Sequence, residues 1–265
     1  MRKYLIASAA AAALFSLAGA ASAQTVGHVG VNYGRHEIDA GALGDTDADA
    51  VQLEGAVAFD AGSLRASIDG AVTNFDADGG DQTLWSATGH LNKKLDQGLI
   101  GGFAGVSTSD DVTLWGVGVE GQFNASPNWT VYGQAGYGQS DDLGDADLWA
   151  ARGEVRYFVS DNFKLQGSAG YTTADVKGGD FDIWNIGADA EYQFANTPFS
   201  VTAGYEHSEI DDFDLKDDTF KVGLRYTFGG TVRDRDQGGA ALGSTANLFG
   251  GSIGQGLIAA VGSFR

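Results

Sequence analysis

The chain has 265 residues, with 16 lysines and arginines against 35 aspartates and glutamates, which gives a formal net charge of −19. Such acidity argues against nucleic-acid binding, because phosphates would be repelled. The chain contains no cysteine, which excludes disulfides and thiol chemistry, and it has 41 glycines but only two prolines. An acidic, glycine-rich chain can be disordered, but the aromatic residues recur too regularly here for that interpretation.

The amino-terminal segment has the layout of a secretory signal peptide. Two basic residues at positions 2 and 3 precede an apolar run, rich in alanine and leucine, that continues to about residue 20. Ala21-Ser22-Ala23 supplies the small residues that signal peptidase accepts, so we predict cleavage before Gln24. A membrane anchor is the alternative, but the run is short and no second apolar helix follows it.

The rest of the chain is a series of segments in which large apolar and polar residues alternate. In residues 219–228, Phe220 and Val222 share one face, whereas Lys221 and Arg225 share the other. A period of two is the pattern of a strand with one apolar and one polar face. We predict twelve strands, the fourth and fifth with the weakest alternation. They are 26–35, 50–59, 64–75, 83–91, 99–106, 112–123, 129–139, 148–158, 163–173, 183–194, 199–207 and 219–228.

Two kinds of connection alternate between these strands. One set is short, at 60–63, 92–98, 124–128, 159–162 and 195–198. The other set is generally longer and holds 23 of the 35 acids, at 36–49, 76–82, 107–111, 140–147, 174–182 and 208–218. Short turns at one end and longer outer loops at the other are typical of a transmembrane β-barrel. The acids that we assign to the outer loops are Asp45, Asp47, Asp49, Asp141, Asp142, Asp211, Asp212, Asp214, Asp217 and Asp218.

The placement of charged residues distinguishes a membrane barrel from a soluble β-sandwich, in whose strands apolar and polar residues also alternate. Fourteen charged residues fall inside the predicted strands, and all except Arg35 lie opposite the large apolar side chains. The remaining thirteen are expected to line the lumen: Glu54, Arg65, Asp69, Glu120, Arg152, Glu154, Arg156, Lys164, Asp189, Glu191, Glu206, Lys221 and Arg225. The sequence therefore predicts an all-β fold, a closed antiparallel transmembrane barrel of about 12 strands.

Aromatic residues near the strand ends support this prediction. We expect one girdle beside the short turns, with Phe75, Phe123 and Phe158 among its members, and a second that includes Trp115 and Trp149. Two such belts mark the two membrane interfaces of a barrel.

With these features the chain resembles the small porins of the Gram-negative outer-membrane β-barrel superfamily. The resemblance covers Gln24 to Phe228 and rests on the signal peptide, the hairpin repeat and a last strand that ends on an aromatic residue. It implies an outer-membrane location with both termini in the periplasm and contact with membrane lipid and lipopolysaccharide. It also implies insertion by the barrel-assembly machinery through the strand that ends at Phe228. No cofactor is expected.

Residues 229–265 depart from the family pattern, because such barrels usually stop at the final aromatic residue. This glycine- and alanine-rich tail could extend as a flexible periplasmic segment, fold back to narrow the lumen, or add strands. We favour the first alternative. The expected organisation is thus a signal peptide at 1–23, a barrel at 24–228 and a flexible periplasmic tail.

Motifs that suggest chemistry lack the context that they need. Gly116 to Gly121 matches a dinucleotide fingerprint but lies in a strand pattern and opens no helix. Asp45, Asp47 and Asp49 begin like a calcium-binding loop, but alanine replaces the required glycine, which leaves at most a weak divalent-cation site. The four histidines lack metal-ligand spacing, and none has an obvious serine partner for hydrolysis. No catalytic residue is assigned, and the protein is not expected to be an enzyme.

The lumen is the remaining candidate site. Its seven acids and six bases could pair into a sealed core or line a wet channel. We favour a narrow channel, because the inner face of the last strand is purely basic and that of the tenth purely acidic. The resemblance then implies passive diffusion of small hydrophilic solutes or ions, with cations preferred because of the acidic outer loops. The alternative is a sealed structural or adhesive barrel whose acidic loops bind divalent cations, lipopolysaccharide or an external partner.

Overall fold

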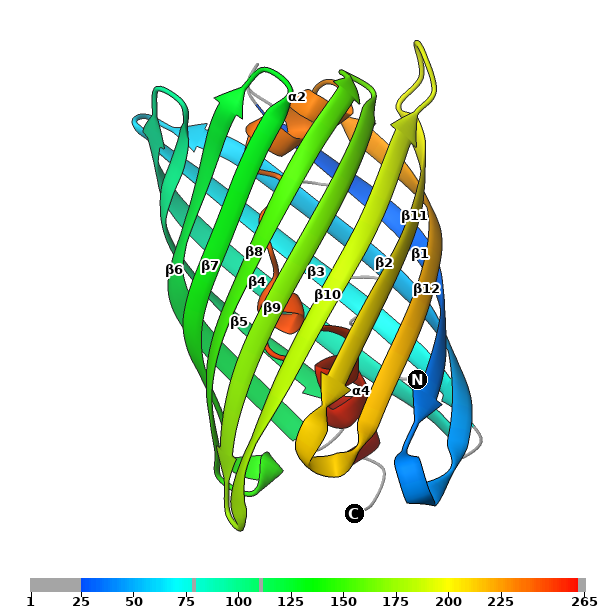
Figure 1. The fold of residues 1–265 in the computed structure, drawn as a ribbon. Coiled ribbons are helices and arrows are strands. Elements are labelled where there is room, and N and C mark those ends of the chain that lie inside the picture. Colours follow the sequence, from blue (N-terminus) through cyan, green and yellow to red (C-terminus); the bar gives the residue numbers. More distant parts are fainter. Residues whose placement is uncertain (1–24, 78–79, 110–111, 262–265) are drawn as a thin grey trace, which may run out of the picture.

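The computed structural model describes residues 25–77, 80–109 and 112–261, so the predicted signal peptide lies outside the described residues. Twelve antiparallel strands form a closed barrel, in which β1 (Val26–Asp39) pairs with β12 (Leu215–Phe228) (Figure 1). The predicted fold and strand number are confirmed. The other strands are β2 (Asp45–Ala61), β3 (Leu64–Ala77), β4 (Gly80–Leu95), β5 (Gly98–Ser109), β6 (Val112–Ser126), β7 (Trp129–Ser140), β8 (Ala146–Ser160), β9 (Phe163–Val176), β10 (Gly179–Gln193) and β11 (Phe199–Ile210).

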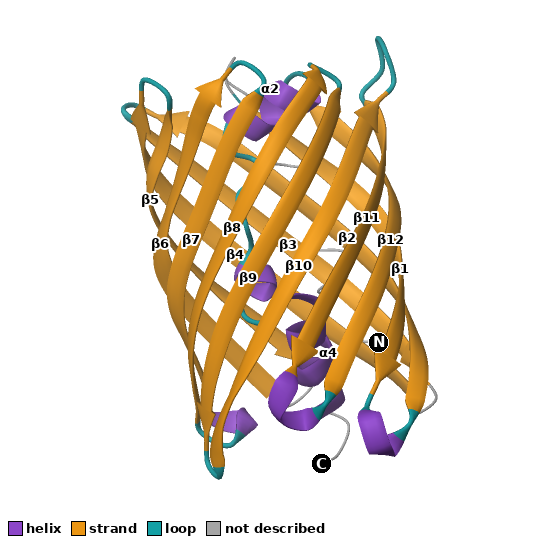
Figure 2. Cartoon of the chain, in the orientation of Figure 1, coloured by secondary structure: helices purple, strands orange, loops and turns teal. Residues whose placement is uncertain are grey.

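The strands continue well into the segments that we predicted as outer loops. β1 runs to Asp39 and β2 begins at Asp45, with only the short 3-10 helix η1 (Gly41–Leu43) between them. Two further 3-10 turns, η2 (Asp141–Leu143) and η3 (Asp211–Phe213), lie at the same end of the barrel (Figure 2). The expectation of long loops was therefore wrong. The strands are longer because apolar residues on their inner face are buried at this end, which we call the loop end.

The outer face of the barrel is apolar, and the strand register determines which side chains reach it. Leu53, Val119 and Leu224 are about half exposed or more, at 49%, 66% and 60%. Aromatic rings pair on this face at both ends of the barrel. The ring centroids of Trp129 and Tyr157 lie 4.7 Å apart near the short turns. Such a surface suits a lipid environment rather than water.

The two predicted aromatic girdles need one correction. Trp115 and Trp149 are exposed at the loop end, and Phe123 is exposed at the end with the short turns. Phe75 and Phe158 are instead buried, at 8% and 0% exposure. Both residues have the inward parity of their strands, and Phe75 belongs to the loop end, because it directly precedes an acidic connection rather than a short turn.

The described part of the carboxyl-terminal tail, residues 229–261, lies inside the barrel, which corrects our expectation of a flexible periplasmic segment (Figures 1 and 2). It forms three helices: α2 (Val232–Gln237) near the short turns, α3 (Thr245–Leu248) in the middle and α4 (Gly251–Val261) at the loop end. None of the helices in the described part of the chain is long and apolar enough to cross a membrane. We call residues 229–261 the plug.

Apolar contacts hold the plug at the loop end. Leu248 and Phe249 are 0% and 2% exposed and pack with Leu114 and Leu148 of the wall. A second small cluster includes Ile253 of α4. The inner face of the strands thus changes from polar near the short turns to apolar at the loop end. Burial of these side chains stabilises the plug, since each large apolar residue contributes about 1.5–3 kcal/mol when fully buried.

Candidate functional site

Arg235 of α2 joins the plug to the barrel wall. Its Nη1 donates to Glu191 Oε1 and to Thr227 Oγ1, each at 2.8 Å, and its Nη2 donates to Glu191 Oε2. Glu191 also accepts from Arg225 Nη1 at 2.6 Å, and Arg225 Nη2 donates to Glu54 at 2.5 Å. Buried charges are tolerated where opposite charges and hydrogen bonds satisfy them. This series of side chains, in which positive and negative charges alternate, meets that requirement.

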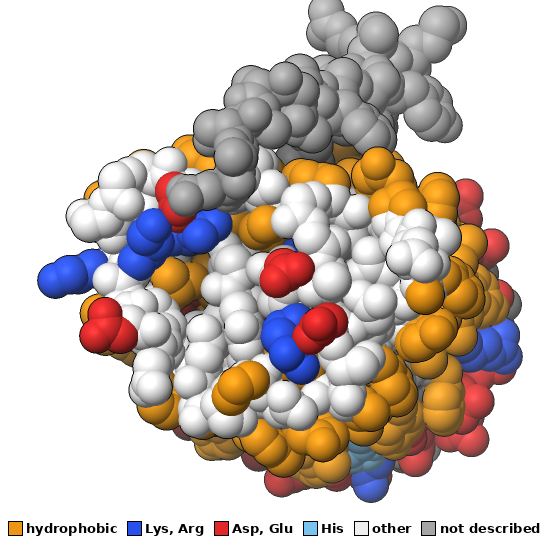
Figure 3. Space-filling model, turned by 90° about the horizontal axis from the view of Figure 1, so that it is seen from above, with side chains coloured by type: hydrophobic (Ala, Val, Ile, Leu, Met, Phe, Trp, Pro, Cys, Tyr) orange, Lys and Arg blue, Asp and Glu red, His pale blue; other side chains and the backbone are white. Residues whose placement is uncertain are grey.

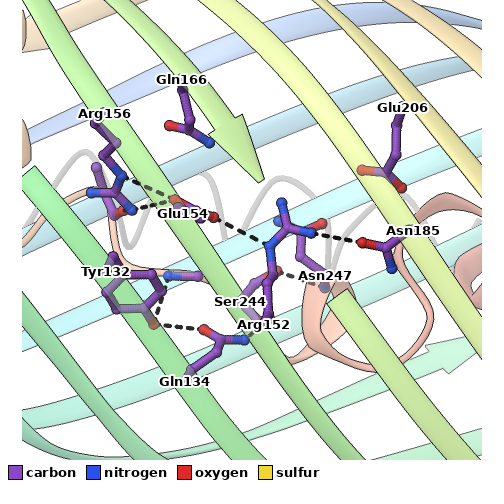
Figure 4. A network of polar contacts seen from close by, with 12 residues as sticks. Tyr132, Gln134, Arg152, Glu154, Arg156, Gln166, Asn185, Glu206, Ser244 and Asn247 are labelled. Carbon is purple, nitrogen blue, oxygen red and sulfur yellow. Dashed lines mark hydrogen bonds and ion pairs between the residues drawn. The ribbon is translucent and has the colours of Figure 1, made fainter. Parts of the chain in front are cut away.

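Asp236, the next residue, extends the network to the neighbouring strands β8 and β9. Its Oδ2 lies 3.0 Å from Arg156 Nη1 and 3.5 Å from Lys164 Nζ. Arg156 also donates to Glu154 through Nε and Nη2, at 3.0 and 2.6 Å, and Arg152 Nε donates to the same carboxylate at 3.2 Å (Figure 4). Two adjacent plug residues of opposite charge therefore complement wall charges from β8, β9 and β10.

A second buried network lies in the wall beside the middle of the plug. His90 bridges two carboxylates, with Nε2 2.8 Å from Asp69 and Nδ1 3.0 Å from Glu120. Tyr132 donates to Glu120 at 2.7 Å, and its hydroxyl oxygen accepts from the backbone N–H of Gly243 in the plug at 3.0 Å. This network therefore also fixes the backbone of the plug.

Backbone groups of the plug are satisfied by other wall side chains. The N–H of Thr245 donates to Thr88 Oγ1 at 3.0 Å, and the N–H of Ser252 donates to Glu206 Oε1 at 2.6 Å. The N–H of Gly250 donates to Thr172 Oγ1 at 3.1 Å. Since buried backbone groups need partners, the polar positions of the strands are what allow irregular chain to lie in the lumen.

Two polar cavities lie beside the plug and are lined by described residues. One has a volume of about 240 Å³ and reaches Lys221 and Asp189, and the other has a volume of about 190 Å³ and reaches His28 and Asp69. They share wall and plug residues, so they are neighbours: Gln52, Glu54, Glu154, Lys164, Gln166, Arg225, Asn247 and Gln255. Seen from the end with the short turns, side-chain and backbone atoms close most of the face that grey atoms do not cover, and charged side chains of both signs lie among them (Figure 3).

The family model of the outer membrane protein beta-barrel domain matches residues 7–228 of the chain. The chain belongs to this family. Membership of this family places the barrel in the outer membrane of a Gram-negative bacterium. No curated protein sequence matches the chain.

Solved structures resemble the barrel in fold. An outer-membrane channel from Pseudomonas putida F1 has a TM-score of 0.59 at 12% identity, with 76% of this chain and 95% of that chain covered. The NanC porin gives 0.57 at 12% identity over 75% and 98% of the two chains. The translocator domain of the autotransporter NalP from Neisseria meningitidis gives 0.54 at 13% identity over 86% and 98%.

The thirteen charged residues that we assigned to the lumen of this outer-membrane barrel are all buried or half-buried. Most of them line the polar cavities or belong to the networks above. Arg65 instead pairs with Asp60, at 2.9 Å. Lys221 approaches Glu206 only to 3.8 Å, and no hydrogen bond or ion pair of the Asp189 side chain occurs among the described residues. Lys221 and Asp189 are therefore the lumen charges least engaged by the protein itself.

The acids that we assigned to the outer loops lie in two settings. Asp141, Asp142, Asp211 and Asp212 lie in η2 and η3, and Asp214 directly follows η3. The others lie within strands, which corrects their assignment to loops: Asp45, Asp47, Asp49, Asp217 and Asp218.

Two of those acids have roles that the sequence did not indicate. Asp217 is 2% exposed and lies inside the barrel, 3.0 Å from His36 Nδ1. Asp218 lies on the outer face, where it binds His207 at 2.8 Å.

An arginine side chain lies where we considered a weak divalent-cation site, at the start of β2. Asp47 and Asp49 bind the Arg35 guanidinium, at 2.5 and 3.3 Å. Within the described residues no group of three or more potential ligands could hold a metal ion. A guanidinium between these carboxylates supplies the positive charge that a cation would otherwise provide.

The sequence did not indicate that several residues take part in the buried networks. His36, His90 and Tyr132 are single polar residues whose partners are distant in sequence. Arg235 and Asp236 belong to a segment that we took as flexible, although its alternation of basic and acidic residues was a signal of complementary pairing. None of these groups forms a hydrolytic relay. The Thr219 hydroxyl and the Asp217 carboxylate both contact the same nitrogen of His36, whereas a nucleophile and an acid need opposite nitrogens.

Proposed function

We propose that the protein is a porin-like channel through which small hydrophilic solutes and ions diffuse passively across the outer membrane. The observation that carries this proposal is the pair of neighbouring polar cavities between the plug and the wall. Their lining is charged and amide-bearing, so water and ions are favoured there over apolar solutes. The path is narrow because the plug occupies much of the lumen.

We further propose that the channel prefers cations. The turns at the loop end are rich in aspartate, and the path includes Asp189, whose carboxylate forms no ion pair within the described part of the chain. A mouth of one sign of charge concentrates counter-ions and repels co-ions. Lys221 opposes this preference locally, so the expected selectivity for K⁺ over Cl⁻ is moderate.

Conductance of the full chain in planar lipid bilayers tests the proposal. We expect small, cation-preferring currents, with the preference read from the reversal potential in a KCl gradient. Gly34 lines the larger cavity, and a Cβ added there would meet nothing closer than 3.8 Å. Gly34→Leu should therefore fold and obstruct the path. Gly133→Leu on the lipid face is the matched control, because its Cβ would also have 3.8 Å of clearance.

A sealed structural or adhesive barrel is the second candidate. The observation that favours it is the attachment of the plug at both ends of the lumen, through Arg235 and through Phe249. In that case the acidic turns would bind divalent cations, lipopolysaccharide or an external partner. Folded full-length protein without any conductance, and with a thermal stability that a chelator lowers, would support this candidate against the channel.

We also propose an orientation and a route of assembly. The even number of strands brings the start of β1 and the end of β12 to the end with the short turns, which we assign to the periplasm. Phe228 pairs with Gly27 at the seam, where the assembly machinery would engage the last strand. A peptide tag inserted at Gly178, between β9 and β10, should be detected on intact cells, whereas a tag at Asp96 should not.

A further inference from the structure

The loop end of the barrel holds a third cavity, of about 350 Å³, which shares no lining residue with the two polar ones. Leu114, Leu148 and Ile183 line it from the wall, and Phe249, Leu257 and Ile258 line it from the plug. Its volume falls at the lower end of the range for small-molecule sites, and such sites are predominantly apolar. The lumen of an outer-membrane barrel is ordinarily polar, so this lining is unusual.

Aromatic side chains mark the entrance to this cavity. Phe181 and Phe213 line it, with ring centroids 5.3 Å apart, and Phe213 on η3 is 60% exposed. An exposed aromatic ring next to an apolar cavity is a feature of ligand-binding surfaces rather than of a completed core.

The charges around the entrance are almost all negative. Three segments at the loop end contribute to the cavity: 141–145, 211–214, and 175–182, which comprises the end of β9, its turn and the start of β10. Together they contain nine aspartates and a single base, Lys177. Anionic amphiphiles would be repelled from such a rim, whereas a cation would be attracted. An apolar cavity under an acidic rim complements a molecule with an apolar body and a positively charged head.

We propose that this cavity binds a small hydrophobic cation, an alkyl or aryl group that carries one ammonium. The apolar body lies among Leu148, Phe249 and Ile258, and the ammonium remains at the rim near η2 and η3. The exposed ring of Phe213 supplies an aromatic face, to which a quaternary ammonium is attracted. Because the plug forms part of the cavity wall, an occupant would contact α4 directly.

Binding to the full chain in lipid nanodiscs tests this proposal independently of conductance. Octyltrimethylammonium is the probe, measured by titration calorimetry after subtraction of protein-free nanodiscs. Octanesulfonate presents the same chain with opposite charge, and tetramethylammonium presents the head alone. We expect saturable binding of the probe and affinities at least about tenfold lower for both controls. Tetramethylammonium lacks the alkyl chain, of which each buried methylene raises affinity roughly fourfold. Octanesulfonate keeps the chain, but the acidic rim repels its sulfonate. Equal affinity for octanesulfonate, or no saturable binding of the probe, would overturn the proposal.

Two variants locate the site. Ala174 lines the cavity and is 2% exposed, so Ala174→Phe should fill the space and weaken binding about tenfold. Ala151→Phe on the lipid-facing side of β8 is the control and should leave binding unchanged. If Ala174→Phe does not fold, the triple variant Asp211→Asn, Asp212→Asn, Asp214→Asn keeps the cavity and should remove the preference for the cation over octanesulfonate. A triple variant that retains this preference would contradict the proposed role of the rim.

Discussion

Arg235 of α2 and Glu191 of β10 form a buried ion pair between the plug and the barrel wall, with Nη1 and Oε1 2.8 Å apart, although 44 residues separate them. Their side chains are 1% and 3% exposed. The pair makes the plug part of the barrel interior, since the removal of either charge would leave the other buried with fewer partners. The state of the plug therefore decides how much of the lumen is accessible to solutes.

The first prediction concerns this attachment. Arg235→Ala should loosen α2 while the barrel stays folded, because Glu191 keeps its second partner Arg225. The loss of one partner of a buried ion pair costs about 3–5 kcal/mol of stability. For the docking of α2 we expect a loss near the lower end of this range. Backbone amides of residues 231–240 should then exchange with deuterium about a hundredfold faster, as measured by mass spectrometry.

Arg233→Ala is the control on the same helix. Arg233 pairs with Asp161, whose side chain is 64% exposed, and exposed pairs contribute about 0–1 kcal/mol. Exchange in the same peptides should rise by less than about fivefold. Similar acceleration by both variants would show that the Arg235–Glu191 pair does not anchor the plug.

The second prediction concerns the apolar end of the plug. A Cβ at Gly116 on the inner face of β6 would collide with the ring of Phe249, coming within 2.9 Å of Cζ. Gly116→Ala should displace Phe249 and destabilise the docked plug by about 1–3 kcal/mol. Chymotrypsin should then cleave after Phe249 in folded protein. Gly121→Ala in the same strand should leave this site protected, because its Cβ would lie 3.7 Å from the nearest atom.

The barrel was predictable from sequence because its signal is local. Alternation within each strand, such as Phe220 and Val222 against Lys221 and Arg225, follows from the geometry of one strand and a lipid-facing surface. The placement of the plug was not predictable in this way, because it depends on contacts such as Arg156 with Asp236, which are 80 residues apart. The apolar inner face at the loop end also escaped prediction, since only the plug explains why Leu114 and Leu148 point inward.

The third prediction concerns the bridge between two wall carboxylates. His90 is 5% exposed and contacts both Asp69 and Glu120. His90→Leu removes the group between two buried acids and leaves them without this partner. The free energy of unfolding, measured by urea unfolding from lipid vesicles, should fall by about 3 kcal/mol. His207→Leu is the comparison, because His207 lies on the outer face and its side chain is 20% exposed. Equal stability losses for the two variants would contradict a special role of the buried bridge.

The fourth prediction concerns the origin of the cation preference. Field effects of the acidic turns act over the Debye length, which is about 10 Å at 0.1 M salt and about 3 Å at 1 M. The reversal potential should therefore indicate a clear preference for K⁺ at a mean KCl concentration near 0.1 M and a much weaker one near 1 M. Asp211→Asn, Asp212→Asn, Asp214→Asn should reduce the low-salt preference, whereas Asp96→Asn in a turn at the opposite end should change it less. A preference that is independent of salt and unaffected by the triple variant would instead place the selectivity in the lumen, with Asp189 as its first candidate.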